Sequence, residues 1–243
     1  MSPHEHHLLR QAEDTYWWYA VLHRLVMHEL RQHLPQGSTI LDAGCGTGGL
    51  LAKLSIWETH GVDLSTEAVR LCHERGLSQV QRGSVNALPF PDAHFDAVLS
   101  LDVLYHQEVD ESRALEEMSR VLKPGGIWIA NLPAFECLRG GHDSAVCGSR
   151  RYKSCHVRRR LRLHNLELVM THYWNAWLFF PLWIWRMQTR KDANPTSDLR
   201  PLPSALNRLL TLGGRADACL SRHLKIPFGS SLFVTASRGT RDL

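Results

Sequence analysis

The stretch Ile40-Leu-Asp-Ala-Gly-Cys-Gly-Thr-Gly-Gly49, followed by Gly61-Val-Asp-Leu-Ser65, decides the fold that this chain is expected to adopt. It combines a buried strand, a glycine turn, a helix and a second strand that ends in an acid. The glycines let the turn come close to a ligand, at the start of a helix where free N–H groups and the helix dipole are available. The pattern therefore predicts a unit that cradles a nucleotide.

Two acids separate this turn from a dinucleotide-binding turn, whose spacing G-x-G-x-x-G the glycines at 44, 46 and 49 also fit. Asp42 lies at the end of the first strand, where a dinucleotide site would place a pyrophosphate, and its charge suits a ligand with an ammonium group. Asp63 ends the next strand and can accept both hydroxyls of a ribose. The expected ligand thus combines a ribose with an ammonium group.

Together these residues resemble the S-adenosylmethionine (SAM) site of class I methyltransferases, of the small-molecule type with a methyltransferase domain 11-like core. Three later segments, Arg82–Phe90, Phe95–Leu101 and Arg120–Gly126, look like further motifs of that family, in order and at the right intervals. The resemblance implies a Rossmann-like, doubly wound α/β fold with seven strands, the last antiparallel. It also implies that ligands lie beyond the carboxyl ends of the strands.

The resemblance implies which residues bind the cofactor, S-adenosyl-L-methionine. Asp42 and the glycine backbone would hold the methionine part, Asp63 the ribose, and Leu64 would pack on the adenine. Ser84 and Asn86 stand where this branch usually has acids, and either side chain can still meet the exocyclic amine. The full expected set is Asp42, Gly44, Cys45, Gly46, Gly48, Asp63, Leu64, Ser84, Val85, Asn86 and Leu101.

Alternating strand and helix patterns predict a parallel sheet covered on both faces. Strands are expected at 39–43, 59–63, 79–83, 95–101, 126–131, 166–174 and 231–236. Helices are expected at 67–75, 111–122, 157–164, 176–190 and 203–223, with a loop over the strand ends at 133–156. One domain over 1–243 would then comprise a helical lid at 1–35, a cofactor-binding core at 36–132, and an acceptor-side segment at 133–243 with helical and aromatic insertions.

Composition excludes several other classes of protein. The 243 residues are 44% hydrophobic and 21% charged with a formal net charge of +4, which is typical of a globular domain and too mild to predict a nucleic-acid partner. Six cysteines without a C-x-x-C pair and fifteen scattered histidines predict neither disulfides nor a metal site. Because no signal pattern appears and the longest apolar run, Ala176–Trp185, is too short to span a bilayer, a cytoplasmic protein is expected.

An acidic and aromatic stretch, Glu13–Tyr19, opens an expected amphipathic helix that runs to about Arg31. One interpretation is a packing helix with aromatic anchors. The other, supported by similar openings in relatives of this methyltransferase branch, is a lid that folds over the cofactor and shields the reaction from water. In the second case Tyr16, Trp17 and Trp18 would contact the acceptor.

Three residues are candidates for acid–base catalysis. His142 and Tyr152 belong to a histidine, aspartate, arginine and tyrosine pattern that resembles the loop after the fifth strand in that branch. His106, after the fourth strand, is the competing base, and its neighbours Asp102 and Tyr105 are expected to face the acceptor. Each histidine can equally be structural.

A basic run at 150–162 precedes a block of aromatic rings at 173–185. The rings, with Trp174 and Trp177 foremost, are expected to line an apolar acceptor pocket. They can also fill a small core beside a solvated arginine face, or the pair can suit a bilayer surface. Nucleic acid is the weakest option, because the rings form one block and do not alternate with the charges.

The sequence therefore predicts a SAM-dependent methyltransferase that acts on a nitrogen or oxygen of a small, largely apolar acceptor, in specialised metabolite biosynthesis. The first alternative is a lipid-linked or quinone-like acceptor met in peripheral contact with a membrane. The second is a protein of another class, a SAM-binding partner or regulator without catalysis, because a fold does not fix a function. The sequence names neither the acceptor atom nor the oligomeric state.

Overall fold

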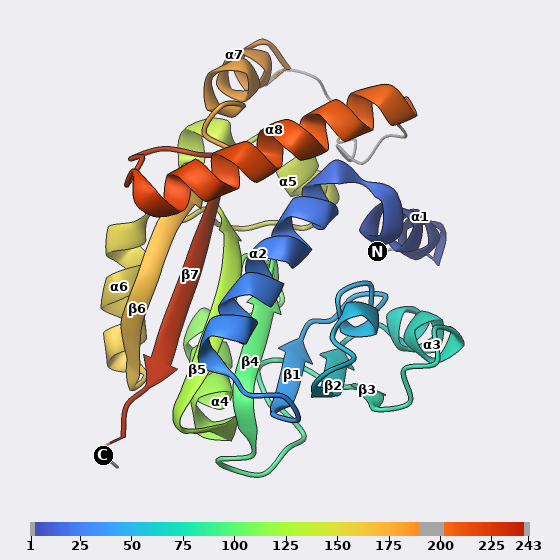
Figure 1. The fold of residues 1–243 in the computed structure, drawn as a ribbon, viewed down its shortest axis with the longest axis vertical. Coiled ribbons are helices and arrows are strands. Elements are labelled where there is room, and N and C mark those ends of the chain that lie inside the picture. The colour runs from blue at the N-terminus through green and yellow to red at the C-terminus, as the bar shows by residue number, and fades with distance from the viewer. Residues whose placement is uncertain (1–2, 190–201, 241–243) are drawn as a thin grey trace.

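The computed structural model describes residues 3–189 and 202–240. They form a seven-stranded sheet in the order β3-β2-β1-β4-β5-β7-β6, with β7 antiparallel to both neighbours (Figure 1). The predicted doubly wound sheet with an antiparallel last strand is confirmed. The strands are β1 Thr39–Ala43, β2 Glu58–Asp63, β3 Val80–Arg82, β4 Phe95–Leu101, β5 Leu122–Pro133, β6 Leu166–Trp174 and β7 Ser231–Arg238.

The sheet is buried on both faces, as its continuous apolar strands require. On one face, α4 (Glu111–Val121) and α6 (Ser154–Leu163) pack Leu115, Met118 and Leu161 against a core that includes Trp128. On the other, α2 (Trp17–His33), α3 (Thr66–Glu74) and α8 (Ser204–His223) cover a second core (Figure 1). This layering leaves the carboxyl ends of β1, β2 and β4 at one edge of the sheet.

Two predicted helix starts are confirmed by their caps. The Ser65 hydroxyl accepts a hydrogen bond from the Ala68 N–H at 3.3 Å, and the Asp110 carboxylate accepts from the Ser112 and Arg113 N–H groups. Such caps satisfy N–H groups that the first turn leaves unpaired. The strand expected at 126–131 is longer than predicted, because β5 begins directly after α4 and takes Lys123-Pro-Gly-Gly126 into its first half.

The N-terminal segment differs from the single helix expected from Glu13 to Arg31. It forms two helices, α1 (Pro3–Thr15) and α2, separated by Tyr16 in extended conformation. The break is held from far along the chain: Asn207 of α8 accepts from the Trp17 N–H at 2.9 Å and donates to the Thr15 carbonyl at 2.7 Å. One side chain thus satisfies both helix ends.

The acceptor-side segment is more ordered than expected. The predicted loop at 133–156 contains η2 (Glu136–Leu138) and α5 (Gly141–Ala145). The helix predicted at 176–190 is α7, which spans Phe179–Thr189. It starts three residues later than predicted, because Asp217 of α8 accepts hydrogen bonds from the N–H groups of residues 175–177 at 2.5 to 3.3 Å. Residues 190–201, between α7 and α8, lie outside the described residues. No helix within 3–189 or 202–240 is long and apolar enough to cross a membrane.

Candidate functional site

The glycine turn follows β1 and bends back beneath the carboxyl ends of the neighbouring strands. Gly44, Gly46 and Gly48 all have positive φ, at 93°, 55° and 80°. At Gly44 a Cβ atom would lie 2.3 Å from Cγ2 of Val103, so only glycine lets the loop after β4 approach this closely. The helix expected after the turn is a single 3-10 turn, η1 (Leu51–Lys53), because the three left-handed glycines prolong the irregular backbone.

Asp42 is the buried acid of the site. Its side chain is 3% exposed, and its Oδ1 atom has no hydrogen-bond partner in the described chain. Burial raises the pKa of this carboxyl to about 8. A buried oxygen without a partner is costly, and a cationic group of a ligand would satisfy it. The site therefore fits the ammonium end of SAM.

Asp63 ends β2 and ties the glycine turn to the next loop. Its Oδ2 accepts from the Gly46 N–H and its Oδ1 from the Ser65 N–H, both at 2.9 Å. Each carboxylate oxygen can accept more than one hydrogen bond, so both remain able to meet ribose hydroxyls. Leu64 beside it is 49% exposed, and its packing on an adenine stays a prediction.

The remaining predicted cofactor residues differ in their hydrogen bonds and in their burial. The Asn86 side chain donates to the Glu108 carbonyl and accepts from the Asp110 N–H, so it joins the loop after β3 to the start of α4. Ser84 accepts from the Asn86 N–H. Cys45 and Val85 are buried, whereas Leu101 is half-buried. The adenine contacts of Ser84 and Asn86 stay predictions.

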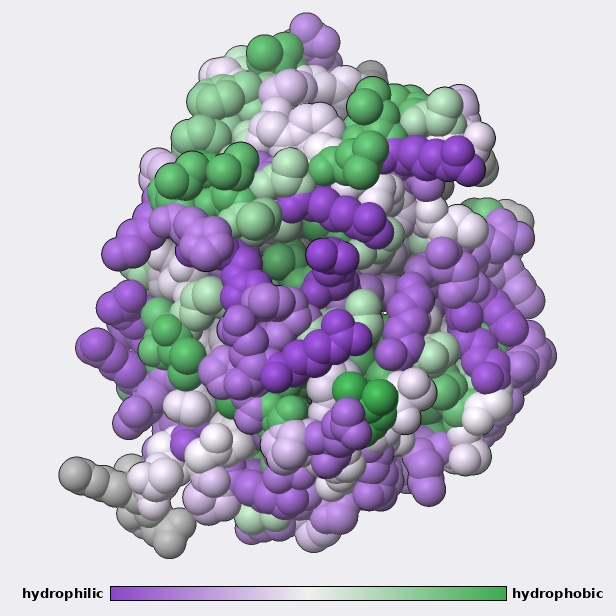
Figure 2. Space-filling view, viewed as in Figure 1, coloured by the Kyte–Doolittle hydropathy of each residue, from purple (hydrophilic) through white to green (hydrophobic). Residues whose placement is uncertain are grey.

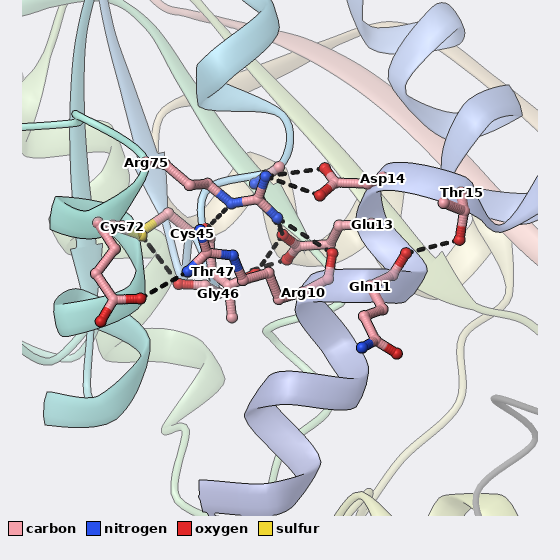
Figure 3. A network of polar contacts seen from close by, with 12 residues as sticks. Arg10, Gln11, Glu13, Asp14, Thr15, Cys45, Gly46, Thr47, Cys72 and Arg75 are labelled. Carbon is pink, nitrogen blue, oxygen red and sulfur yellow. Dashed lines mark hydrogen bonds and ion pairs between the residues drawn. The ribbon is translucent and has the colours of Figure 1, made fainter.

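Glu13 of α1 enters the glycine turn, a contact that the sequence does not reveal. Its Oε1 accepts from the Thr47 N–H at 3.2 Å, and its Oε2 accepts from the Thr47 hydroxyl at 2.5 Å and the Gly49 N–H at 2.8 Å (Figure 3). The carboxylate therefore occupies backbone donors of the turn. No short-range pattern announces it, because the partners lie more than thirty residues apart.

Ion pairs hold α1 against α3. Asp14 contacts Arg75 at 2.9 Å, and the same arginine donates to the Thr47 carbonyl at 2.7 Å, as Figure 3 shows. One helical turn away, Arg10 pairs with Glu74 at 2.9 Å. α1 therefore covers the glycine turn, which is the position expected of a lid.

The predicted acceptor rings separate into two groups. Trp18 of α2 stacks on Trp174 with ring centroids 5.7 Å apart, and Trp174 is fully buried with its indole N–H donating to Asn131 at 2.9 Å. Trp17 is buried against α8 and meets Trp177, which is 41% exposed. The structure does not gather the described rings of 173–185 around one cavity, so the pocket they were expected to line stays a prediction.

Asp102 follows β4 directly and is the acid on the acceptor side. Its backbone has a left-handed φ of 56°, its N–H donates to the Asn131 carbonyl, and its Oδ2 accepts from the Asn131 amide at 2.8 Å. Burial raises the pKa of the carboxyl to about 7. Tyr105 is buried and stacks on the half-buried His106, with ring centroids 4.5 Å apart. Burial lowers the pKa of His106.

The loop after β5 is anchored by Tyr152, a predicted catalytic residue, and by its neighbour Arg151. Tyr152 is buried and its hydroxyl donates to the Leu104 carbonyl at 3.1 Å, while Arg151 forms a buried ion pair with Asp143 at 2.8 Å. In this position Tyr152 holds the loop against the segment after β4, and a part in catalysis stays a prediction. His142 belongs to α5, but its side chain lies outside the described residues.

Comparisons with known proteins agree with this geometry. Residues 41–130 match the family model described as "Methyltransferase domain". A tRNA (carboxymethyluridine(34)-5-O)-methyltransferase of Arabidopsis thaliana is 37% identical over 107 residues, which are 43% of this chain and 26% of that protein. A dimethylglycine N-methyltransferase of Parasynechococcus marenigrum is 35% identical over 115 residues, 43% of this chain and 41% of that protein.

The solved structure of the [4+2]-cyclase SpnF superposes with a TM-score of 0.61 and 22% identity, over 94% of this chain and 87% of that one. The chain spans only 26% and 41% of the lengths of the two curated relatives named above. The residues that match the family model, 41–130, run from β1 through the glycine turn to β5. With the family model matched at residues 41–130, and with the predicted sheet and glycine turn observed, this part of the chain is a methyltransferase domain of the class I, S-adenosylmethionine-dependent type.

Proposed function

We propose that this chain transfers the methyl group of SAM to a nitrogen or oxygen of a small, largely apolar acceptor, as part of specialised metabolism. The observation that carries this proposal is the setting of Asp102. This carboxylate lies at the end of β4, next to Val103, which packs on Gly44 of the glycine turn. Aromatic side chains of α2 and β6 surround the same edge of the sheet. An acceptor bound there would lie beside the cofactor.

The residues of the chain contribute binding, orientation and water exclusion. SAM, when bound, supplies a methyl group that its sulfonium already activates. Asp42 would neutralise the ammonium group of its methionine part, and Asp63 would accept hydrogen bonds from its ribose. α1, held by Glu13, would keep water out, so that alignment in a dry site supplies most of the rate. An oxygen acceptor needs a base, and Asp102 and His106 are the nearest groups that can take a proton.

Radiolabelled SAM, offered with a panel of amines, phenols, carboxylic acids and total tRNA, tests this function. Transfer to a small molecule is expected, with a loss of at least about tenfold in the Asp42→Ala variant and none in the exposed-carboxylate control Asp92→Ala. Absence of both SAM binding and transfer would reject the proposal. SAM binding without transfer to any acceptor would favour the alternative of a SAM-binding protein without methyltransferase activity. A cyclase with the same fold illustrates that this fold does not fix the function.

A lipid-linked acceptor at a membrane surface is the second candidate, and the outer face of α7 and α8 favours it. Phe180, Ile184 and Met187 of α7 are each more than half exposed, as are Leu209 and Leu212 of α8. Figure 2 shows hydrophobic residues gathered over these helices at the top of the view. Exposed apolar patches of this kind mark interaction sites.

An RNA acceptor is a further candidate, because one relative is named a tRNA methyltransferase. The basic run predicted from the sequence contributes exposed arginines on α6, of which Arg160 already lies 3.4 Å from Glu111. They belong to the face of the sheet opposite α2 and are not interleaved with aromatic rings, as a stacking groove would require. A small-molecule acceptor is therefore the better-supported proposal, and the tRNA arm of the assay decides between them.

A further inference from the structure

We propose that Asp102 and the rings around it form a recognition site for a protonated amine, so that the acceptor is an amine whose proton Asp102 removes. This inference rests on the proposed methyl transfer and narrows its acceptor to one chemical class. It assigns Asp102 a catalytic role that neither His106 nor His142 would then need to supply.

The backbone holds Asp102 in a fixed and unusual place. A non-glycine residue with φ of 56° is uncommon and persists where the surroundings determine it. Here the Asn131 carbonyl accepts the Asp102 N–H at 2.9 Å and the Asn131 amide donates to Oδ2 at 2.8 Å. Oδ1 receives no hydrogen bond from the described residues. One oxygen is thus anchored while the other is available to a ligand.

Asn131 also connects this carboxylate to the aromatic rings. Its amide oxygen accepts the indole N–H of Trp174 at 2.9 Å, and Trp174 stacks on Trp18. Trp18 in turn meets Tyr19 edge to face, with ring centroids 5.0 Å apart. Burial, together with the charges of Glu13 and Asp102, raises the pKa of Tyr19. Asn131 therefore links the Asp102 carboxylate to the stacked pair of Trp174 and Trp18 through two hydrogen bonds of its amide group.

This combination selects a cation over a neutral acceptor. Aromatic faces attract ammonium groups, most strongly when the groups leave water, and a nearby carboxylate adds a direct charge contact. The guanidinium group that acts on Asp102, that of Arg151, is already paired with Asp143 at 2.8 Å.

The proton has a defined destination. The charged and titratable groups that face Asp102 are Tyr19 of α2, Tyr105 and His106 of its own loop, and Arg151 of the loop after β5. Burial outweighs the Asn131 hydrogen bond and the Arg151 charge and raises the pKa of Asp102 to about 7. Such a carboxyl takes up a proton far more readily than an exposed aspartate.

The step balances as follows. The acceptor's R–NH3+ gives one proton to the Asp102 carboxylate, which becomes a neutral acid, and the amine nitrogen regains its lone pair. That lone pair forms the new N–C bond while the C–S bond breaks, and the bonding electrons stay on sulfur. The product leaves as R–NH2+–CH3, and Asp102 releases its proton to water.

Binding of a permanent cation tests the recognition site without relying on turnover. Choline carries a quaternary ammonium group, and 3,3-dimethylbutan-1-ol is its uncharged isostere, so the difference between them reports charge alone. With the demethylated cofactor product present, calorimetry is expected to show choline binding at least about tenfold more tightly than the isostere. Asp102→Asn is expected to abolish this preference, and the surface variant Asp92→Asn to retain it.

The variant is chosen to fold, because asparagine accepts left-handed backbone as readily as aspartate. Its affinity for the cofactor product is expected to stay within about twofold of the wild type, which reports an intact cofactor site. Equal affinity of the wild type for choline and its isostere would overturn the inference. So would an unchanged preference in Asp102→Asn.

The acceptor panel separates this inference from the function on which it rests. Transfer to amines, with kcat in Asp102→Asn falling and its dependence on pH flattening, supports both. Transfer to phenols or carboxylic acids alone would overturn the amine site and leave the methyltransferase proposal standing. Choline selectivity without any methyl transfer would support the cation site and count against the proposed reaction.

Discussion

At the scale of single residues, the carboxylate of Asp63 serves the fold and the ligand together. Its oxygens accept the Gly46 and Ser65 N–H groups and still have lone pairs directed at the expected ribose. A side chain with two such roles is hard to replace, because its loss leaves two backbone donors without partners.

Replacing Asp63 by Ala is therefore expected to weaken SAM binding by about 1.5 to 3 kcal/mol and to lower stability by about 1 kcal/mol. Isothermal calorimetry and urea unfolding measure the two effects, with Asp92→Ala as the matched control. NAD should give no heat with either protein. Unchanged SAM affinity in Asp63→Ala would remove this residue from the cofactor site.

Trp174 and Trp177 allow a direct test of core against pocket. Trp174 is fully buried and hydrogen-bonded, so Trp174→Ala is expected to lower the free energy of unfolding by about 3 to 5 kcal/mol. Trp177 is 41% exposed, so Trp177→Ala is expected to lower the free energy of unfolding by only about 1 kcal/mol. Thermal melts compare the variants. Similar melting temperatures, with KM for the acceptor raised in Trp174→Ala alone, would instead assign Trp174 to the acceptor surface.

Asp42 predicts a dependence of stability on pH. Its folded pKa of about 8 lies above the unfolded value of 3.8, so the stabilisation is complete below the unfolded pKa and is lost as pH rises through the folded pKa. Between about pH 5 and pH 8.5 the ligand-free protein should lose at least about 1 kcal/mol of unfolding free energy that Asp42→Asn does not lose. Bound SAM should reduce the loss. Parallel urea titrations of both proteins that keep a constant difference would contradict this.

At the scale of elements, α1 behaves as a cover held by side chains more than by a core. Its contacts with the glycine turn and α3 are the Glu13 carboxylate and the ion pairs of Arg10 and Asp14. Glu13 is buried, but the Arg10 and Asp14 pairs lie at a partly exposed surface, where ion pairs are individually weak, so we expect the helix to open more readily than the sheet.

Hydrogen exchange followed by mass spectrometry measures that opening. Peptides from residues 3–15 are expected to exchange faster than those of β4, to slow when the cofactor product binds, and to exchange several-fold faster in Glu13→Ala. Gln11→Ala, at an exposed position of the same helix, serves as the control. Equal protection of α1 with and without ligand would make it a packing helix.

The sequence predicts elements well where the signal is local. β6 has the predicted bounds Leu166–Trp174, and the Ser65 and Asp110 caps stand at the expected helix starts. What it could not predict depends on distant partners. The break at Tyr16 is held by Asn207, and the polar role of Glu13 depends on Thr47, so neither is visible in the periodicity around it.

At the scale of the whole molecule, the exposed apolar face of α7 and α8 also carries positive charge. Within the described residues 175–189 and 202–230, the only acidic residue is Asp217, which is buried. Arg208 and Arg215 in the same stretch are exposed. Basic and apolar side chains on one face suit an anionic lipid surface. The protein is therefore expected to float with phosphatidylglycerol vesicles in a density gradient, and less with phosphatidylcholine.

Replacing Phe180 and Ile184 together by Ser should abolish flotation without lowering the melting temperature, since both side chains are more than half exposed. Salt at about 0.5 M should weaken it, because screening acts on the arginines. Flotation that the double variant retains would show that this face is not the contact. Sedimentation with equal efficiency on neutral and anionic vesicles would remove the role of charge.

Asn207 connects α8 to the N-terminal helices, because its side chain hydrogen-bonds both the last carbonyl of α1 and the first N–H of α2. The hinge of the cover is thus fastened to the helix that carries the exposed apolar face. If a bound surface displaces α8, we expect these two hydrogen bonds to be strained, and release of α1 would free the Asn207 side chain. By thermodynamic reciprocity, a contact on α8 that favours opening is itself favoured by opening to the same extent, so cofactor exchange and docking are expected to be coupled.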